Sequence, residues 1–334
     1  MKNKNFFKNK SILITGGTGS FGSAFLEYLT KNFKGFRKVV VFSRDELKQY
    51  NLSLKFPENK YPYLRFYLGD IRDLKRLEFV LEDIDYVVHA AALKQVPAAE
   101  INPFESIQTN VIGAQNIIEA ALFNNVKKIV ALSTDKAVAP INLYGATKLC
   151  SDKLFISANN IKGKRNISFS VARYGNVMGS RGSVIPVFLR QKEKGQVTLT
   201  DKNMTRFNIK LKEAIETVLW MLFNCIGGEV VIRKAPSYKI IDVKNAIAPK
   251  AKIKIIGIRE GEKIHEELIT ETDSLNTYSI DKYYLNLSAL DQKNKNMYIK
   301  KFKAKKVDRN FRYNSLENKH YLSVKNIKKE IKNN

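Results

Sequence analysis

Disulfide-forming and metal-binding residues are scarce in this chain of 334 residues. Its two cysteines, Cys150 and Cys225, are too few for a disulfide framework, which favours a reducing compartment. Its three histidines, His89, His265 and His320, show no metal-ligand spacing among themselves or with the cysteines. We therefore expect no metal site.

Long apolar runs are also lacking. No stretch approaches the roughly 18 apolar residues needed to cross a membrane. The basic segment 1–10 imitates the start of a signal peptide, but the apolar run after it is broken at once by Gly16 and Gly17. The sequence thus predicts a cytoplasmic protein without membrane insertion.

Acidic residues are few relative to basic ones. The chain has 58 lysines and arginines against 32 aspartates and glutamates, a formal net charge of +26. Clustered cations favour nucleic-acid binding because they release counterions from phosphates. Here the lysines are spread along the whole chain and many adjoin asparagine, so we expect no nucleic-acid partner. A positive field also suits an anionic cofactor and substrate.

The first half of the chain alternates short apolar runs with helix-length segments. The runs predict strands at Ser11–Thr15, Lys38–Phe42, Leu64–Leu68, Tyr86–His89, Lys128–Leu132 and Ser168–Arg173. The segments between them predict helices at Phe21–Lys31, Asp45–Phe56, Leu74–Leu81, Pro103–Asn124 and Leu143–Asn160. This alternation predicts an α/β fold with a doubly wound parallel sheet, the Rossmann arrangement.

The regular alternation of predicted strands and helices ends after about Gly179. Helices are expected at Leu211–Asn224 and Gly261–Leu268, and strands at Glu229–Ile232 and Lys252–Ile256. We expect residues 1–178 to form a dinucleotide-binding domain that carries the catalytic residues. Residues 179–334 should form mainly a smaller α/β substrate lobe, although segments of the two can interleave, and the chain should end in a frayed helix.

A glycine-rich turn connects the first strand to the first helix. Gly16 allows a tight turn, Gly19 admits a phosphate close to the backbone, and Gly22 lets helix and strand approach closely. A glycine triplet alone is a weak signal, and a ligand-free turn is the alternative. Its place between a predicted strand and a predicted helix indicates a dinucleotide site.

The end of the second strand bears on the choice of cofactor. An acidic residue there would bind the ribose 2′-hydroxyl of NAD, but the chain has Ser43 and Arg44, which suit the 2′-phosphate of NADP. Asp45 comes one place too late and should cap the next helix. Asp70, after the third strand, is placed either to meet the adenine or to cap a helix.

A second group of polar residues follows the fifth strand. Residues 133–136 read Ser-Thr-Asp-Lys, and Tyr144 and Lys148 follow at a spacing of one helical turn. A lysine beside a tyrosine favours the phenolate, which can remove a proton from a sugar hydroxyl while hydride leaves. A chance pair, and an exposed Asp135-Lys136 pair on a loop, are the alternatives.

These motifs resemble those of extended short-chain dehydrogenase/reductase enzymes. The resemblance covers nearly the whole chain, through TGGTGSFG, SRDELK, HAAALKQVP, LSTDKA, YGATK, RYGNVMGSRGSV and GIREGEK. Within that family the chain is most similar to the soluble inverting UDP-N-acetylglucosamine 4,6-dehydratases of the pseudaminic-acid type. Retaining sugar dehydratases typically have Asp-Glu where this chain has Asp135-Lys136, and simple epimerases lack such a pair.

The resemblance implies a lyase that removes water from a UDP-linked amino sugar. NADP⁺ takes hydride from carbon 4 with the help of Tyr144 and Lys148. A neutral Lys136 then removes the proton on carbon 5, and a protonated Asp135 donates to the leaving hydroxyl on carbon 6. Hydride returns to carbon 6, and carbon 5 is reprotonated on the opposite face. The pKa of Asp135 should therefore be raised and that of Lys136 lowered, and the two can exchange roles.

The resemblance also assigns site residues and an assembly. The catalytic residues are Thr134, Asp135, Lys136, Tyr144 and Lys148. The NADP-binding residues are Gly16, Thr18, Gly19, Ser20, Phe21, Gly22, Ser43, Arg44, Asp70, Ile71, Ala90, Lys94, Tyr144, Lys148 and Val177. The substrate-binding residues are Lys94, Ser133, Thr134, Asn176, Arg181, Gly182, Ser183, Val184, Thr200, Arg206, Arg259 and Glu262. Close relatives tend to have histidine at Gln95, and a homo-oligomer is expected.

Two other functions compete with this hypothesis. A UDP-sugar 4-epimerase or reductase of the same fold would not need the Asp135-Lys136 pair for elimination. A non-catalytic NADP-sensing or nucleic-acid-binding protein is suggested only by the charge. It would have no need of Asp135, Tyr144 and Lys148 together.

Overall fold

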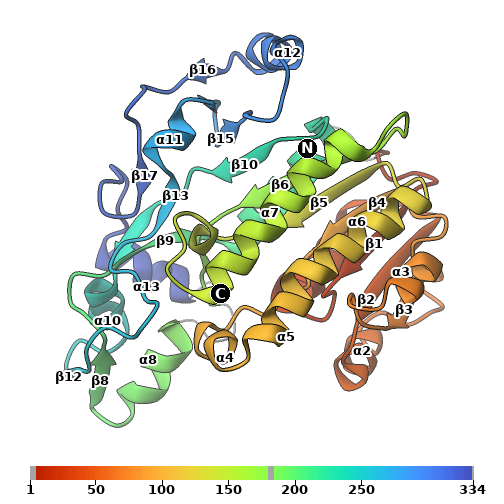
Figure 1. Ribbon diagram of the computed structural model, residues 1–334. Coiled ribbons are helices and arrows are strands. Elements are labelled where there is room, and N and C mark those ends of the chain that lie inside the picture. The colour runs from red at the N-terminus through yellow and green to blue at the C-terminus, as the bar shows by residue number, and fades with distance from the viewer. Residues whose placement is uncertain (1–4, 180–183, 333–334) are drawn as a thin grey trace.

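The computed structural model describes residues 5–179 and 184–332 (Figure 1). Its centre is a ten-stranded sheet. The parallel part of the sheet runs in the order β3 (Leu64–Leu68), β2 (Lys38–Ser43), β1 (Ser11–Thr15), β4 (Tyr86–His89), β5 (Lys128–Leu132), β6 (Ser168–Arg173) and β10 (Val230–Arg233). Beyond β10 the sheet continues through the antiparallel strands β15 (Tyr283–Asn286), β14 (Thr277–Ser279) and β16 (Lys305–Lys306). The predicted doubly wound α/β fold is confirmed.

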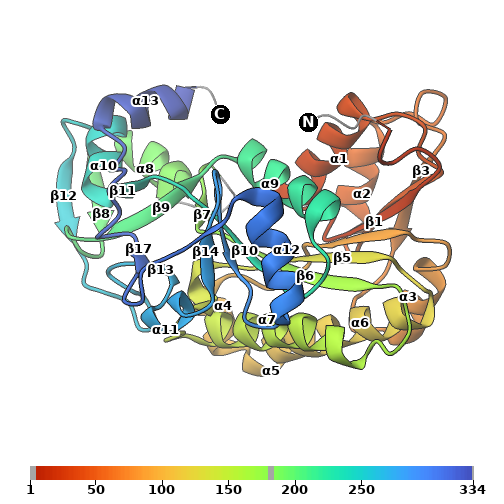
Figure 2. The ribbon, with the colours of Figure 1, turned by 90° about the horizontal axis from the view of Figure 1, so that it is seen from above.

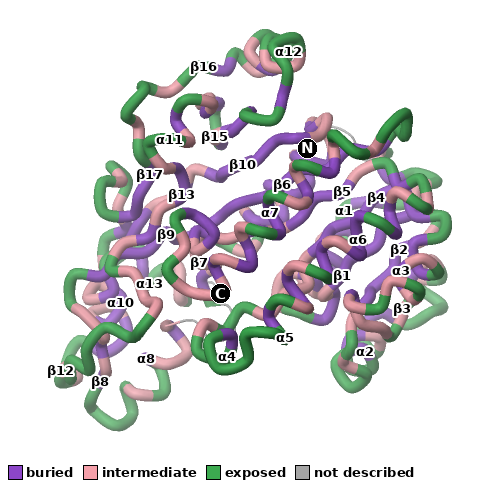
Figure 3. The backbone as a smooth tube through the Cα atoms, viewed as in Figure 1, coloured by how far each residue is buried: buried purple, intermediate pink, exposed green. Residues whose placement is uncertain are grey.

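Helices cover both faces of this sheet (Figure 2). One face packs against α1 (Ser20–Asn32) and α9 (Leu211–Asn224), and the other against α3 (Leu74–Val80), α6 (Gly113–Phe123) and α7 (Leu143–Ile161). Successive residues of a strand point to opposite faces, so Ile12 and Ile14 join the first core while Leu13 joins the second. Burial on both faces explains why the parallel strands are continuously apolar, and why Figure 3 shows them buried along most of their length.

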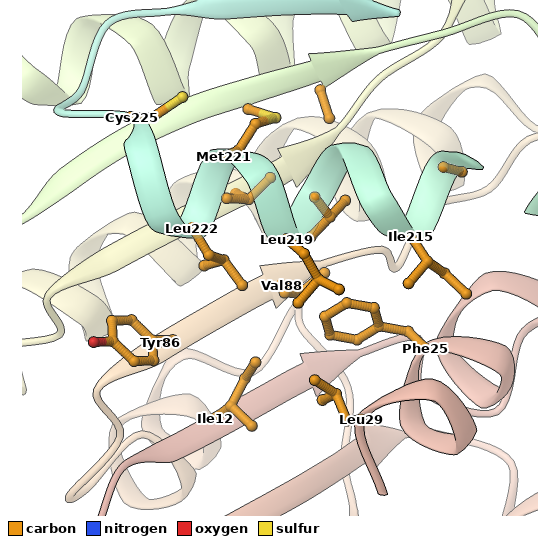
Figure 4. Close-up of a cluster of buried hydrophobic side chains, with 14 of the residues drawn as sticks. Ile12, Phe25, Leu29, Tyr86, Val88, Ile215, Leu219, Met221, Leu222 and Cys225 are labelled. Atoms are coloured by element: carbon orange, nitrogen blue, oxygen red, sulfur yellow. The ribbon is translucent and has the colours of Figure 1, made fainter. Parts of the chain in front are cut away.

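Helix α9 shows that the two halves of the sequence interleave. Its residues Ile215 and Leu219 lie against Phe25 of α1 and above Ile12 of β1 (Figure 4). Leu219 and Phe25 are both fully buried. The chain beyond residue 178 thus completes one layer of the dinucleotide-binding half and adds β10 and β14–β16 to its sheet. The division into domains at residues 178 and 179 stays a prediction.

A smaller lobe lies beside the main sheet and has its own core. It contains a pair of parallel strands, β8 (Gln196–Leu199) and β12 (Lys252–Ile255), and a three-stranded sheet of β7 (Asn176–Val177), β9 (Thr205–Ile209) and β11 (Ser237–Lys239). Its helices are α8 (Val184–Lys192), α10 (Ile240–Ile247) and α13 (Val324–Lys332). Phe188, Val243 and Ile327 connect these helices in one apolar cluster.

The remaining elements include two departures from the sequence predictions. The helix expected at 103–124 is divided into α5 (Pro103–Ile107), a π-helical turn η1 (Gln108–Ile112) and α6. The helix expected at 261–268 is wrong, because the chain turns at Gly261 with φ +71° and then forms β13 (Glu267–Ile269), paired with β17 (Tyr313–Asn314). The other elements are α2 (Glu46–Ser53), α4 (Val96–Ile101), η2 (Asp135–Ala137), α11 (Glu271–Ser274) and α12 (Gln292–Phe302). Among the described residues, no helix is both long and apolar enough to cross a bilayer.

Candidate active site

A cavity of about 870 Å³ opens where the parallel strands end and the smaller lobe begins. Gly16, Ser43 and Ser133 each lie at or just after the carboxyl end of a strand, the edge at which open α/β sheets bind ligands. Every described residue that the sequence assigned to the site lines this cavity. Arg181, Gly182 and Ser183 lie outside the described residues.

The glycine loop packs closely against neighbouring backbone, with which side chains at these positions would collide. A Cβ at Gly16 would lie 2.9 Å from the backbone of Ala91, and one at Gly22 would lie 2.5 Å from Cα of Gly17. Helix α1 begins after Gly19 without a side-chain cap, although a helix start needs partners for its first N–H groups. The loop therefore fits the pyrophosphate of a dinucleotide.

Ser43 and Arg44 lie at the end of β2, as predicted for the ribose end of the cofactor. Asp45 caps α2 by accepting a backbone hydrogen bond, which confirms its predicted role. Asp70 is paired with Arg72 at 2.7 Å and with Arg44 at 3.4 Å, and it does not cap α3. Burial would raise the pKa of Asp70, but hydrogen bonds from Arg72 and the charge of Arg44 outweigh it and lower that pKa.

Tyr144 and Lys148 lie one turn apart on α7 and both line the cavity. Helix α7 begins there because Asn142 caps it, with Oδ1 accepting a hydrogen bond of 2.7 Å from the N–H of Gly145. Burial raises the pKa of Tyr144 to about 12, against the opposing charge of Lys136. Burial lowers the pKa of Lys148. Tyr144 therefore holds its proton at neutral pH in this structure.

Asp135 is almost fully buried at the start of the short helix η2. Its Oδ1 accepts a hydrogen bond of 2.9 Å from Oγ1 of Thr134 and lies 3.2 Å from Nζ of Lys136. Its Oδ2 is buried and has no hydrogen-bond partner among the residues that the structure describes. Burial raises the pKa of Asp135, even though the charge of Lys136 opposes that effect. The expected direction for an acid catalyst is thus present.

Lys136 does not show the lowered pKa that the sequence analysis expected. Its Nζ lies 3.1 Å from Oε1 of Glu266 as well as beside Asp135. Burial alone would lower the pKa of Lys136, but these two carboxylates outweigh burial and raise it. The expectation failed because Glu266 is 130 positions away in the chain, within a segment predicted to be an ordinary helix. No local spacing connects it to Lys136.

The far wall of the cavity is built around Arg206. Its side chain is buried, and Nη1 donates 2.8 and 2.9 Å hydrogen bonds to the carbonyl oxygens of Thr205 and Ile264. Nη2 lies 3.5 Å from Oε1 of Glu262, and Nε lies 3.6 Å from Oε1 of Glu266. These contacts hold the guanidinium in the wall of the cavity, where an anionic ligand can reach it.

The other predicted substrate residues occupy different parts of the rim and wall. Arg259 and Lys94 are exposed, on the loops after β12 and β4, while Oγ1 of Thr200 donates to the sulfur of Met204. Oδ1 of Asn176 is buried without a hydrogen-bond partner among the described residues. The cavity wall also contains residues that the sequence analysis did not assign to the site: Asn142, Tyr174, Gly175, Tyr238, Lys263 and Glu266.

Ser133 is connected to a buried network behind the catalytic helix. Its Oγ donates a hydrogen bond of 2.7 Å to Oδ2 of Asp152, which also lies 3.4 Å from Nη2 of Arg173. Ser133 is therefore held in place by α7 and β6. In the described part of the chain, no group of three or more His, Cys, Asp or Glu side chains is arranged to hold a metal ion.

The doubly wound sheet, the glycine loop and the Tyr144–Lys148 pair together define a short-chain dehydrogenase/reductase. More particularly, the chain belongs to the family of polysaccharide biosynthesis proteins whose sequence model matches residues 12–287.

Three known proteins illustrate this relationship. An inverting UDP-N-acetylglucosamine 4,6-dehydratase of Campylobacter jejuni is 48% identical over 327 residues, which cover 96% of this chain and 97% of that protein. A UDP-glucose 4-epimerase of Rickettsia bellii is 41% identical over 285 residues, which cover 83% of each chain. The X-ray structure of Pen from Bacillus thuringiensis is 38% identical, covers 98% of both chains and superposes with a TM-score of 0.89.

Proposed function

We propose that this chain is a UDP-N-acetylglucosamine 4,6-dehydratase that inverts the configuration at carbon 5. The observation that carries the proposal is the pair of the buried Asp135 and the partly buried Lys136, which shares a cavity with Tyr144. Elimination of water needs an acid and a base beside the sugar in addition to the tyrosine that serves hydride transfer, and neither epimerisation nor reduction needs that second pair. The likeness to the Campylobacter jejuni dehydratase over 96% of the chain supports the same activity.

The cofactor that fits the site is a nicotinamide dinucleotide. The start of α1 after Gly19, which has no side-chain cap, suits its pyrophosphate, and Tyr144 and Lys148 line the same cavity. NADP is favoured over NAD because Arg44 is half-exposed at the end of β2, where its guanidinium can bind a 2′-phosphate.

When bound, a nicotinamide dinucleotide would supply the hydride acceptor for carbon 4 of the sugar and the hydride donor for carbon 6. Tyr144, assisted by Lys148, takes the proton from the carbon 4 hydroxyl as the ketone forms, and it does so as the phenolate, which the charge of Lys136 favours against the effect of burial. The ketone acidifies the proton on carbon 5, and Lys136 removes it in the neutral form. Asp135 donates its proton to the hydroxyl that leaves carbon 6 as water. Once carbon 6 has received hydride, carbon 5 takes a proton on the opposite face, which inverts its configuration. The sum is loss of one water, with no net oxidation.

The substrate proposed for the smaller lobe is a UDP-linked amino sugar. Arg206 and Arg259 would contact the diphosphate, since guanidinium groups suit phosphate oxygens. Glu262, beside Arg206 in the wall, would meet the ribose. Asn176 has a buried amide oxygen that still needs a donor, which a sugar hydroxyl could supply. A homo-oligomer and a cytoplasmic location stay predictions.

The test is incubation with UDP-N-acetylglucosamine in deuterated water, followed by proton NMR. We expect a 4-keto-6-deoxy product with deuterium at carbon 5 and coupling constants of the L-configuration. Tyr144→Phe should lower kcat by about 10²- to 10⁴-fold. Tyr50→Phe, an exposed tyrosine on α2, is the control and should keep wild-type activity.

A UDP-sugar 4-epimerase is the second candidate, because the Rickettsia bellii relative is 41% identical. The same spectra separate the two reactions. An unchanged carbon 6 with an altered carbon 4 would establish the epimerase and overturn the dehydratase. No turnover with added NADP⁺ would contradict both activities on this substrate.

A further inference from the structure

Lys136 lies between two carboxylates that come from distant parts of the chain. Its Nζ is 3.2 Å from Oδ1 of Asp135 and 3.1 Å from Oε1 of Glu266. Glu266 is held firmly, because its N–H donates a 2.9 Å hydrogen bond to Oγ of Ser315 and its carbonyl oxygen accepts one of 2.7 Å from the N–H of Ser315. The position of the Glu266 carboxylate is therefore a property of the fold.

A purely structural role explains this carboxylate poorly. Glu266 is 2% exposed, and its Oε2 has no hydrogen-bond partner among the described residues. A buried ion pair contributes little net stability because desolvation offsets the attraction, and a buried acceptor left unpaired is costly. Glu266 nevertheless lines the cavity. The Lys136–Glu266 contact adds little stability but lies beside the groups proposed to react, which favours a role for Glu266 in the reaction.

In the proposed reaction, the Lys136 ammonium must lose a proton before it can act as a base, and that proton needs an acceptor. Lys136 is to act as a neutral base toward carbon 5 while Asp135 enters the reaction protonated, so the Glu266 carboxylate, 3.1 Å from Nζ, is the group that favours the ammonium form of Lys136. Asp135 cannot accept the surplus proton, because its own proton is needed for the leaving hydroxyl. Glu266 is the other acceptor within hydrogen-bond distance of Lys136 among the described residues.

We infer that Glu266 positions Lys136 and takes its surplus proton when substrate binds. This inference rests on the proposed dehydratase function. In the step, an N–H bond of the Lys136 ammonium breaks and an O–H bond forms on Oε1 of Glu266. The pair passes from one positive and one negative charge to two neutral groups, so the net charge is conserved. The free electron pair on Nζ then takes the proton of carbon 5.

Arg206 connects this step to the substrate. Its Nε lies 3.6 Å from the same Oε1 of Glu266 that contacts Lys136. Burial would raise the pKa of Glu266, but the charges of Lys136 and Arg206 outweigh it and lower that pKa. A diphosphate beside Arg206 compensates its charge, and a bound sugar excludes water from the cavity. Both changes favour the neutral form of the Lys136–Glu266 pair. Lys136 therefore becomes a neutral base only when substrate is bound.

The test compares Glu266→Gln with Glu267→Gln. Glutamine keeps the size of the side chain but cannot take a proton. Glu267 is adjacent in sequence, pairs with Arg312 at 2.9 Å and does not line the cavity, so it is a matched control. We expect Glu266→Gln to lower kcat by about 10²-fold with KM within about threefold of wild type. Because removal of hydride from carbon 4 does not involve Glu266, this variant should accumulate the 4-keto sugar with the original hydrogen still on carbon 5. Glu267→Gln should match the wild type.

Each outcome in this experiment is decisive. A Glu266→Gln variant with wild-type kcat, or one that exchanges carbon 5 hydrogen at the wild-type rate, would overturn the inference and leave the dehydratase intact. No turnover by the wild type would overturn both. Should the glutamine variant not fold, as judged by thermal unfolding, Glu266→Asp replaces it. A kcat at least tenfold lower at unchanged KM supports the inference, since a displacement of about 1 Å can cost up to 10²-fold, and a wild-type kcat overturns it.

Discussion

The side-chain amide of Asn142 donates a hydrogen bond of 2.7 Å to the carbonyl oxygen of Gly261. The same side chain caps α7 through its Oδ1. One residue thus joins the helix that carries Tyr144 and Lys148 to the loop that carries Arg259 and Glu262. The close approach requires glycine at 261, where φ is +71° and a Cβ would lie 2.8 Å from that of Asn142.

Removal of this contact should affect both stability and substrate binding. We expect Asn142→Ala to lower the free energy of unfolding by about 1 kcal/mol, because the cap of α7 is lost. KM for the UDP-sugar should rise more than kcat falls, because the loop at Gly261 loses its hydrogen bond to residue 142. Asn102→Ala is the control, since the exposed Asn102 side chain donates to the carbonyl of Ala98 and, although Asn102 precedes α5, makes no side-chain cap hydrogen bond to that helix. Urea unfolding and steady-state kinetics measure the two effects, and an unchanged KM would refute the role of the hydrogen bond to Gly261 in substrate binding.

Arg44 should determine the preference between the two nicotinamide cofactors. We expect Arg44→Ala to weaken NADP binding by about 10- to 100-fold, since a hydrogen bond between charged groups contributes about 1.5–3 kcal/mol. NAD binding should change little, because NAD has no 2′-phosphate. Loss of the half-exposed Arg44–Asp70 pair should hardly affect stability. Calorimetric titration measures both affinities, with Arg65→Ala on β3 as an exposed control. Equal losses for the two cofactors would contradict the assignment.

His89 should make the protein sensitive to acid. It is buried beside Oγ1 of Thr15, and burial, with a smaller effect of the Lys148 charge, lowers the pKa of His89 to about 3. Below about pH 6.5, His89 therefore binds a proton in the unfolded chain but stays neutral in the folded protein. The stability that the neutral His89 contributes is fully present above that pH and is lost as pH falls from 6.5 toward 3. Between pH 7 and pH 5 the loss should be on the order of 2 kcal/mol.

The measurement for His89 is urea unfolding at those two pH values. His89→Gln keeps a polar partner for Thr15 but does not titrate, so it should lose less stability than the wild type on acidification. His320→Gln changes an exposed histidine and should behave like the wild type. Parallel losses in the wild type and in His89→Gln would show that other groups cause the acid sensitivity.

The sequence predictions succeeded where the signal is local. The six strands predicted in the first half are confirmed to within a residue, and Leu211–Asn224 is helical as predicted. The spacing of Tyr144 and Lys148 depends only on helix geometry. The predictions failed where the tertiary structure overrides local preference. The helix expected at 261–268 gives way to a turn and to β13.

The alternating α/β architecture, the glycine loop and about half of the residues that line the cavity could be predicted from the sequence. These depend on periodicity and on the chemistry of short segments, which neighbouring residues control. Only the tertiary structure decided that α9 completes the first layer of helices, that Asn142 reaches Gly261, and that Glu266 lies beside Lys136. The charge state of Lys136 follows from that last contact. It depends on burial and on a carboxylate 130 positions away, and no local pattern encodes a distance between such groups.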